Sequence, residues 1–448
     1  MDMITNTMDL TTFPAKNKYA HLLFQLHFSI GLLALSLLAL PGVPANIGIA
    51  LLALTLLRLP TTIKTLSILF REPLFLLLIA WWSFALLSIS WSDNPEKNLL
   101  ANPYLLLIIP ALYPLLQESK NAILALGLGV AIHTGIQGLM WLGVMDGIRY
   151  APRTLSGGLH WYPPYTALWS AATLTLLLGL LLTAKSKRDI RFSFLLLLPI
   201  PLSLLLAGNR TIFILLPISL IILAVKLFLF LPLKRKRIQA IAVCALIVLV
   251  GIGVLVLPGT SPSRRISAIF NQVYSTTEIG QPEIPSAPNQ VMRDIRKRRV
   301  DRYVNSYGLR YVWWRGGFEI WKGSPWIGYG GGSTFKQFAR IEAKMPTELG
   351  ADVEGFITPE PHSTMLATAI EQGLVGIALM FAFASLGLLR SIRCVRNSPS
   401  LIGLSAAWFT VIVFSFAHTI QFSAYASTLI IILTTLTLGL TQKTQKAS

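Results

Sequence analysis

The sequence predicts an all-α integral membrane protein, a polytopic bundle of about 12 transmembrane helices with one large polar loop late in the chain. Hydrophobic residues make up 54% of the chain and charged residues 13%, whereas soluble globular domains carry about 25% charged residues. The apolar segments are continuous Leu, Ile and Ala runs, which favours helices over the alternating strands of a membrane barrel. A polar insert of about 100 residues, too long for a simple connection, interrupts them.

The apolar runs give the position of each predicted span, because a helix needs about 20 mainly apolar residues to cross the hydrocarbon. The predicted spans are 20–40, 43–59, 73–91, 102–117, 121–144, 163–184, 191–208, 210–231, 238–257, 362–389, 400–419 and 423–441. They divide the chain into an N-terminal transmembrane bundle (1–257), a loop domain (258–361) and C-terminal transmembrane helices (362–448).

The distribution of Lys and Arg predicts the orientation. With the N-terminus in the cytoplasm, most basic residues of the short loops lie inside, as the positive-inside rule requires. The short outer loops then hold only Lys97, Arg149, Arg153 and Arg210. Both termini are therefore expected in the cytoplasm, and the long insert in the periplasm of a bacterial inner membrane. Nucleic acid is a poor partner for an insert on that side.

Several classes of site are absent from the sequence. It contains no Walker loop, no dinucleotide glycine fingerprint and no HExxH motif, so ATP-driven chemistry and a zinc protease site are not supported. The two cysteines, Cys244 and Cys394, are poorly placed for a mutual disulfide and have no metal-ligand spacing. We expect neither a metal nor a cofactor.

Arginines near the outer face are candidate ligands for phosphate. Arg210 follows Gly208-Asn209 at a very short turn between two apolar spans. An ionisable residue at that depth is costly and is by default a functional hypothesis, although an interfacial, snorkelling arginine is the alternative. Arg149 and Arg153 lie in another outer loop. Guanidinium groups bind diphosphate in a bidentate manner, so these residues indicate a lipid-linked phosphate ligand.

The insert carries three further patterns. Its basic run Arg296-Lys297-Arg298-Arg299 is either a solvated helix face or a patch for lipid phosphate, and Arg265 is a further candidate of this kind. The segment 311–321 has aromatic residues at helical spacing, which can form an aromatic face at the membrane interface. Packing is the expected use of such a stripe, and a platform for sugars is the alternative. The run Gly328 to Ser333 is either a flexible turn or a backbone cradle for a ligand.

The insert ends at Pro361-His362-Ser363-Thr364, where the polar loop gives way to an apolar helix. His362 is therefore placed at the boundary between water and membrane. A histidine can accept a proton near neutral pH, while the alternative for this position is a residue that caps or packs against the following helix. His160, in an outer loop, is expected to be structural, and His133 and His418 remain unassigned.

These segments resemble the O-antigen ligase family, in a superfamily that also holds O-antigen polymerases and protein O-oligosaccharyltransferases. The resemblance covers about 145–389 and is carried by the large late loop and a few short motifs. Ser363 departs from the family, which often has Asn after the histidine. The motifs are Gly208-Asn209-Arg210, Arg310 to Trp314, Ser324-Pro325-Trp326-Ile327-Gly328-Tyr329-Gly330, Pro361 to Leu366 and Glu371-Gln372-Gly373, with Arg153 and Ser156-Gly157 as a looser match.

The resemblance implies a GT-C-like glycosyltransferase that moves a polysaccharide from undecaprenyl diphosphate to a sugar hydroxyl of lipid A-core. His362 and Arg210 are then the catalytic candidates, with Arg210, Arg153 and Arg310 on the donor diphosphate. Acceptor or lipid phosphates are assigned to Arg265, Arg296, Arg298 and Arg299. Fixed arginines can stabilise the leaving diphosphate, and the sequence has no Asp-x-Asp pattern, so a metal-independent, inverting reaction is expected.

Three other functions are alternatives to the ligase. A polymerase or a protein O-oligosaccharyltransferase would use the same lipid-linked donor and differ in the acceptor. A transporter of lipid-linked sugars would favour broken spans and internal repeats, and no clear repeat is visible in the sequence.

Overall fold

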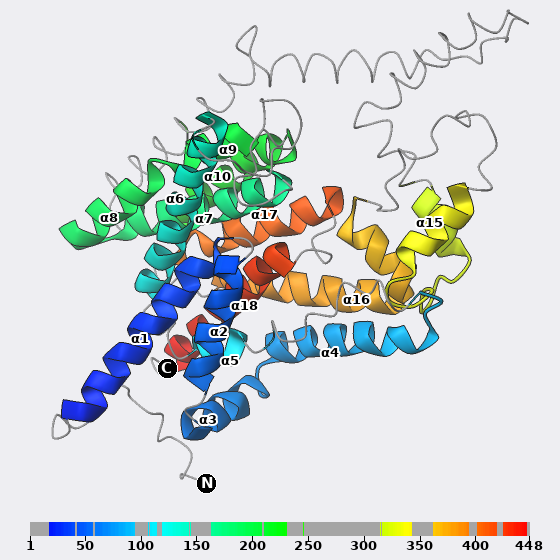
Figure 1. The fold of residues 1–448 in the computed structure, drawn as a ribbon, viewed down its shortest axis with the longest axis horizontal. Helices are drawn as coiled ribbons and strands as arrows, with labels where there is room; N and C mark the ends of the chain where they lie inside the picture. The colour runs from blue at the N-terminus through cyan, green and yellow to red at the C-terminus, as the bar shows by residue number, and fades with distance from the viewer. Residues whose placement is uncertain are drawn as a thin grey trace, which may run out of the picture.

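The computed structural model contains only helices among the residues it describes, which confirms the predicted all-helical class (Figure 1). Five helical segments are long and apolar enough to cross a membrane: Pro73–Trp91, Ser119–Leu142, Pro164–Thr183, Lys187–Ala207 and Thr364–Arg393. The described residues are 18–40, 43–56, 59–94, 106, 108–113, 119–142, 144, 163–207, 210–230, 245, 314, 316–342, 362–393, 401–418 and 424–445.

The N-terminal part of the chain forms a series of separate helices. The order along the chain is α1 (Lys18–Leu38), α2 (Val43–Leu56), α3 (Leu59–Leu69), α4 (Pro73–Leu87), the short 3-10 helix η2 (Ser88–Trp91) and α5 (Ile108–Leu112). The sequence did not predict α3, which lies mostly between the predicted spans 43–59 and 73–91. Of the predicted span 102–117, the described residues form only the short α5, which is buried throughout.

The middle of the bundle consists of α6 (Ser119–Leu142), α7 (Pro163–Thr183), α8 (Lys187–Leu197), α9 (Ile200–Ala207) and α10 (Arg210–Phe230). The predicted span 191–208 is divided into α8 and α9 by a turn at Leu198 and Pro199. Proline has no backbone N–H and cannot continue the ladder of a helix, which accounts for the division. The predicted span 238–257 lies outside the described residues, apart from Ala245.

The last part consists of α15 (Thr334–Glu342), α16 (Thr364–Arg393), α17 (Leu404–Ala417) and α18 (Ala424–Gln445). Their positions agree with the predicted spans 362–389, 400–419 and 423–441, with shifted ends. Within the predicted loop domain, the described residues are 314 and 316–342.

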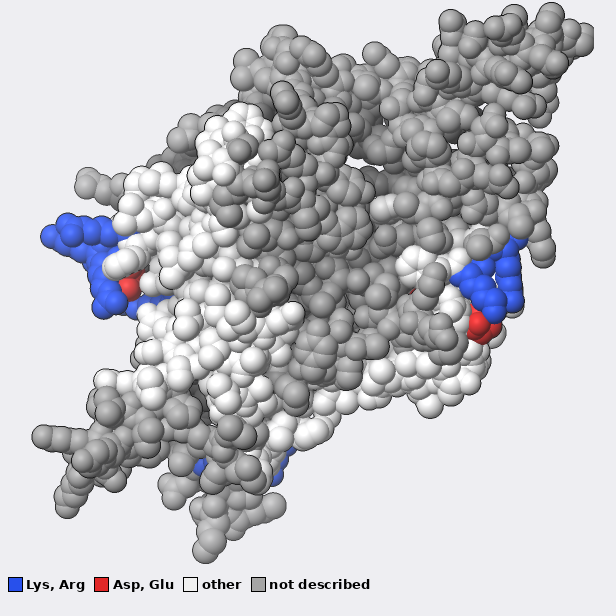
Figure 2. Space-filling view, in the orientation of Figure 1, with Lys and Arg blue, Asp and Glu red and all other residues white. Residues whose placement is uncertain are grey.

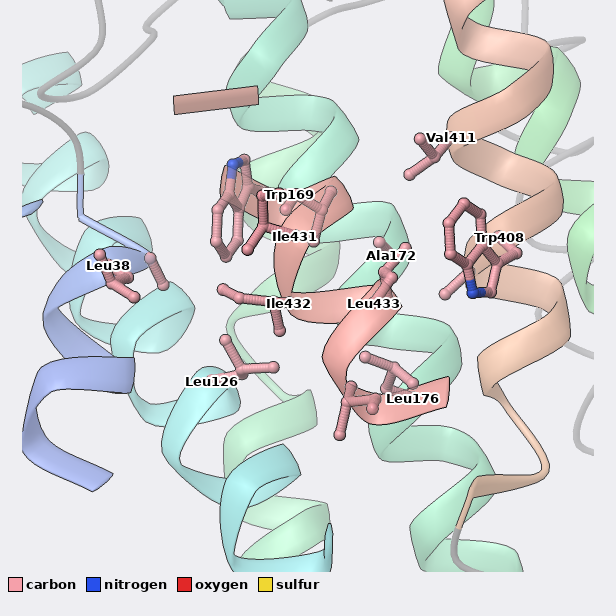
Figure 3. Close-up of a cluster of buried hydrophobic side chains, with 14 of the residues drawn as sticks. Leu38, Leu126, Trp169, Ala172, Leu176, Trp408, Val411, Ile431, Ile432 and Leu433 are labelled. Carbon is pink, nitrogen blue, oxygen red and sulfur yellow. The ribbon is translucent and has the colours of Figure 1, made fainter. Parts of the chain in front are cut away.

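α7 lies at the centre of the helix packing. Of its most apolar window 83% is buried, against 33% for the window in α16. Trp169 and Leu176 of α7 lie in one apolar cluster with Leu38 of α1, Trp408 of α17 and Ile432 of α18 (Figure 3). Polar side chains also join helices inside this core, where such hydrogen bonds assist association. Examples are Ser219–Thr410 (2.7 Å), Ser170–Ser203 (2.9 Å) and Trp408 Nε1 to Thr437 Oγ1 (2.9 Å).

Charged side chains are visible over α8 and over α15, on opposite sides of the view, with a few more at its lower edge (Figure 2). α4 packs against α16. Arg390 NH1, near the end of α16, donates to Glu72 Oε2 just before α4 (2.7 Å), and the amide of Gly331, next to the residue that binds Glu371, donates to the carbonyl of Ser88 just after α4 (3.3 Å). The part of α16 after Gly373 is therefore antiparallel to α4.

Candidate functional site

α16 is broken at Gly373, whose backbone has φ 62° and ψ −157°. Glycine adopts this left-handed region without the steric cost that a Cβ atom adds. The part of α16 before Gly373 and the part after it run in different directions (Figure 1). A break in a membrane helix frees backbone groups that need partners in the absence of water.

The segment 324–333 supplies those partners. It crosses the break and is hydrogen-bonded to the backbone on both sides of Gly373, so that the freed groups of α16 are paired with protein. The amides of Tyr329 and Gly330 donate to the carbonyls of Ile370 and Glu371 (2.8 and 2.9 Å), and those of Leu374 and Val375 donate to the carbonyls of Pro325 and Trp326 (2.8 and 3.2 Å).

The glycines of this segment permit the close approach. Gly328 and Gly330 have φ values of 69° and 90°. A Cβ on Gly328 would collide with the backbone of Glu371, and one on Gly330 with the backbone of Ser92. Of the two interpretations of the glycine run, a turn and a ligand cradle, the contacts support the turn, and its conformation is set by packing against α16 and η2.

Side chains hold the same segment in place. The buried Glu371 accepts a hydrogen bond from Thr334 Oγ1 (2.8 Å) at the start of α15. Asp93, just after η2, binds α15 through Arg340 NH1 (2.9 Å) and Gln337 Nε2 (3.2 Å). α15, η2 and the first part of α16 are thus fixed to one another.

Aromatic side chains of the insert are exposed next to this unit. Trp314 and Phe318 are 47% and 49% exposed, and Trp326 is 70% exposed. Leu374 and Val375, whose amides bind the backbone beside Trp326, are also exposed residues of the predicted membrane helix α16. This arrangement favours the membrane-interface interpretation of the aromatic spacing.

His362 directly precedes α16, where the sequence predicted it. Its φ of 46° makes it the single non-glycine residue with a positive φ among the described residues, and such conformations cluster at functional sites. The His362 side chain is partly buried, and Ser363 next to it is buried.

Thr364 and His418 connect the His362 turn to the end of α17. The backbone N–H and the Oγ1 of Thr364 both donate to the carbonyl of His418, at 3.2 and 2.9 Å. The ring of His418 in turn places Nε2 at 3.4 Å from Oγ1 of Thr211, the second residue of α10. Since α10 begins at Arg210, the structure brings together the chain positions of the two leading catalytic candidates.

The His362 turn lies alongside the middle of α4. Thr364 lines a pocket with Leu78, Trp81 and Trp82 of α4 and with residues of α18. Glu371 instead lies at the η2 end, where Gly330 contacts both Glu371 and Ser92. The first part of α16 therefore begins inside the bundle at Thr364 and reaches the η2 end at Glu371. His362, just before Thr364, lies away from the η2 end.

The sequence was compared with models of known protein families. Residues 192–381 match the model of the family described as O-antigen ligase. Over this region the chain is similar to the O-antigen ligase family. This confirms the resemblance inferred from the motifs and supports a glycosyltransferase role of the ligase or polymerase type. No curated protein sequence matches the chain.

The region that matches the O-antigen ligase family model contains most of the site. It includes Arg210, the segment 324–333, His362 and the break at Gly373, and it ends before His418. The contact of Thr364 with His418 therefore joins the matched region to a part of the chain outside it.

Ser363, inside the matched region, has a defined structural role. Its Oγ accepts a hydrogen bond from the amide of Leu366 (3.3 Å), and its carbonyl accepts one from Ala367 (3.0 Å). These contacts make Ser363 the N-cap of α16. Ser and Asn are both favoured N-caps, so the Asn that the family often has and the Ser found here can do the same work.

The other predicted site residues cannot be placed in the same way. The described part of Arg210 is its backbone at the start of α10. His160 and the basic candidates Arg149, Arg153, Arg265, Arg296, Arg298, Arg299 and Arg310 lie outside the described residues. Within the described ranges, no group of three or more His, Cys, Asp or Glu side chains could hold a metal ion.

Sequence reasoning missed Asp93, Glu371 and His418 as parts of the site. Glu371 was quoted only within a motif, and Asp93 was not singled out. The available signal for His418 was its position at the very end of a predicted span, where a buried polar ring has to find partners.

Proposed function

We propose that this protein is an O-antigen ligase, which transfers a polysaccharide from undecaprenyl diphosphate to a sugar hydroxyl of lipid A-core. The observation that carries the proposal is the meeting of the His362 turn with the start of α10 at His418. A base and a diphosphate-binding arginine belong close together in such a reaction, because the acceptor attacks the carbon that the diphosphate leaves.

The proposed reaction is a direct displacement. His362 accepts the proton of the acceptor hydroxyl as its oxygen forms a bond to the anomeric carbon. The bond from that carbon to the phosphate oxygen breaks, and undecaprenyl diphosphate leaves with the electron pair. A single displacement inverts the configuration at the anomeric carbon.

Arginines stabilise the leaving group in this scheme. Arg210, assisted by Arg153 and Arg310, binds the diphosphate through charge-assisted hydrogen bonds. Preorganised positive charge of this kind can meet the charge that develops in the transition state, and we propose that the reaction is metal-independent. Arg265, Arg296, Arg298 and Arg299 are assigned to phosphates of the acceptor or of membrane lipids. The proposed location is the periplasmic face of the inner membrane, with both termini in the cytoplasm.

The first test replaces the two leading residues. We expect His362→Ala and Arg210→Ala each to abolish attachment of polysaccharide to lipid A-core in cells, while the amount of protein in the membrane stays unchanged. Attachment is measured from the size distribution of the lipopolysaccharide. His133→Phe, on α6, is the control and should keep normal attachment. Normally ligated lipopolysaccharide in either alanine variant would contradict the assigned role.

A second experiment identifies the acceptor. Purified protein receives the undecaprenyl diphosphate-linked polysaccharide together with lipid A-core, a second carrier-linked glycan or a protein, each with and without a chelator. We expect transfer to lipid A-core alone, unaffected by the chelator. Transfer to the other glycan would indicate a polymerase, transfer to protein an oligosaccharyltransferase, and movement across vesicles without bond formation a transporter.

A further inference from the structure

His418 is a buried histidine to which the proposed reaction assigns no role. It lies at the C-terminal end of α17, with 2% of its surface exposed. Its ring stacks on that of Phe414, one turn earlier in α17, with the centroids 4.3 Å apart and the planes at 19°. This stacking restricts rotation of the imidazole and keeps its nitrogens in a defined direction.

The two ends of His418 bind different elements. The ring approaches Thr211 in the first turn of α10, with Nε2 3.4 Å from Oγ1. The backbone carbonyl accepts both hydrogen bonds from Thr364 at the start of α16. One residue therefore connects the helix that begins at Arg210 with the turn that carries His362.

The packing of α17 allows His418 to act on both neighbouring helices. α17 packs against both α10 and α16, and near this end Phe414 belongs to the apolar core. A satisfied polar contact inside such a packed interior adds rigidity and specificity to the arrangement of the helices that it joins.

We infer that His418 is a positioning residue for glycosyl transfer, which fixes the start of α10 relative to the His362 turn. The inference rests on the proposed function, since it concerns the distance between the diphosphate-binding arginine and the base. A misplacement of about 1 Å between reacting groups can lower a rate on the order of 100-fold.

The variants test the contact of the His418 ring separately from the contact of its backbone carbonyl. His418→Phe keeps an aromatic ring that can stack on Phe414 but removes the nitrogens, and the carbonyl that binds Thr364 remains. Thr211→Val removes the hydroxyl with little change of shape. His418→Gln keeps an amide nitrogen at the end of the side chain, close to the position of Nε2, and serves as the conservative variant.

The measurement is the kcat and KM of purified enzyme for donor and acceptor, per amount of folded protein, together with thermal unfolding. We expect His418→Phe and Thr211→Val each to lower kcat by roughly 10- to 100-fold, with KM for the acceptor and the unfolding temperature near wild type. His418→Gln should recover most of kcat. The double variant His418→Phe/Thr211→Val should be no slower than the slower single variant, because both changes remove one contact.

The matched control is His133→Phe, because His133 is also buried and lies on α6, which packs against α1, α7, α8 and α9. This variant should keep the wild-type kcat. An unchanged kcat in His418→Phe or in Thr211→Val, or losses that multiply in the double variant, would overturn the inference while leaving the proposed function intact. Failure of the wild-type protein to transfer glycan to any acceptor would instead overturn the proposed function, and the inference with it.

Discussion

His362 holds a left-handed backbone conformation that costs a non-glycine residue on the order of 1 to 3 kcal/mol, with a φ of 46°. The contacts that follow it offset this cost. Ser363 caps α16 through Leu366, and Thr364 is fixed by two hydrogen bonds to the carbonyl of His418. The position of the histidine is thus determined by the two residues after it.

The N-cap role of Ser363 can be tested by substitution. Ser363→Ala removes the oxygen that accepts the Leu366 amide, and loss of an N-cap costs about 1 kcal/mol. Ser363→Asn supplies another side-chain oxygen at the same position. We expect the alanine variant to unfold at a lower temperature in detergent and the asparagine variant to match wild type in unfolding and in glycan transfer. If the asparagine variant loses as much stability as the alanine variant, capping is not the role of Ser363.

At the scale of elements, the broken helix α16 and the segment 324–333 form one unit. The backbone of each completes the hydrogen bonding of the other. Glycine occupies the positions where the two segments approach most closely. Neither element could adopt its observed conformation alone, since the carbonyls and amides at the break would lack partners.

Glycine substitutions test this unit. Gly328→Ala and Gly373→Ala place a methyl group against the opposing backbone and at positive φ values of 69° and 62°. We expect both variants to reduce the yield of folded protein and to abolish glycan transfer. The control is Gly135→Ala in α6, where a Cβ meets nothing within 4 Å and where alanine is a better helix former than glycine by about 1 kcal/mol. Wild-type behaviour of Gly373→Ala would argue against a rigid break.

For the whole molecule, the antiparallel pairing of α4 with the later part of α16 joins two distant parts of the chain. The ion pair between Glu72 and Arg390 lies at one end, with side chains 11% and 18% exposed. The contact of Gly331 with Ser88 lies at the other. Shielding from water strengthens the attraction between the charges, and it also makes a lone charge costly.

Removing one partner of this pair should therefore destabilise the protein. We expect Glu72→Gln and Arg390→Gln each to lower the stability in detergent by about 3 kcal/mol, and the double variant to lose less than the sum of the two. The pair of Lys322 and Glu319 is the control, since both side chains are 53% exposed, and Glu319→Gln should have little effect. Additive losses at Glu72 and Arg390 would show that the two charges are not coupled.

The helices were predictable from the sequence because long apolar runs have few alternatives in a membrane. The break in α16 was not, because Glu371-Gln372-Gly373-Leu374 lies in a run that is equally compatible with a continuous helix. What decides the conformation is its partner 324–333, far away in the sequence. The position of His362 before α16 was predicted from a local boundary, while the role of His418 depends on long-range contacts with Thr211 and Thr364 that no local pattern indicates.

The connection of segment 324–333 to the break has a mechanical consequence for His362. Residues 364–372 form a short rigid arm, gripped at Ile370 and Glu371 by the segment 324–333 and pivoted at Thr364 on the end of α17. A displacement of the segment 324–333 would therefore act on the turn that contains His362 through residues 364–372.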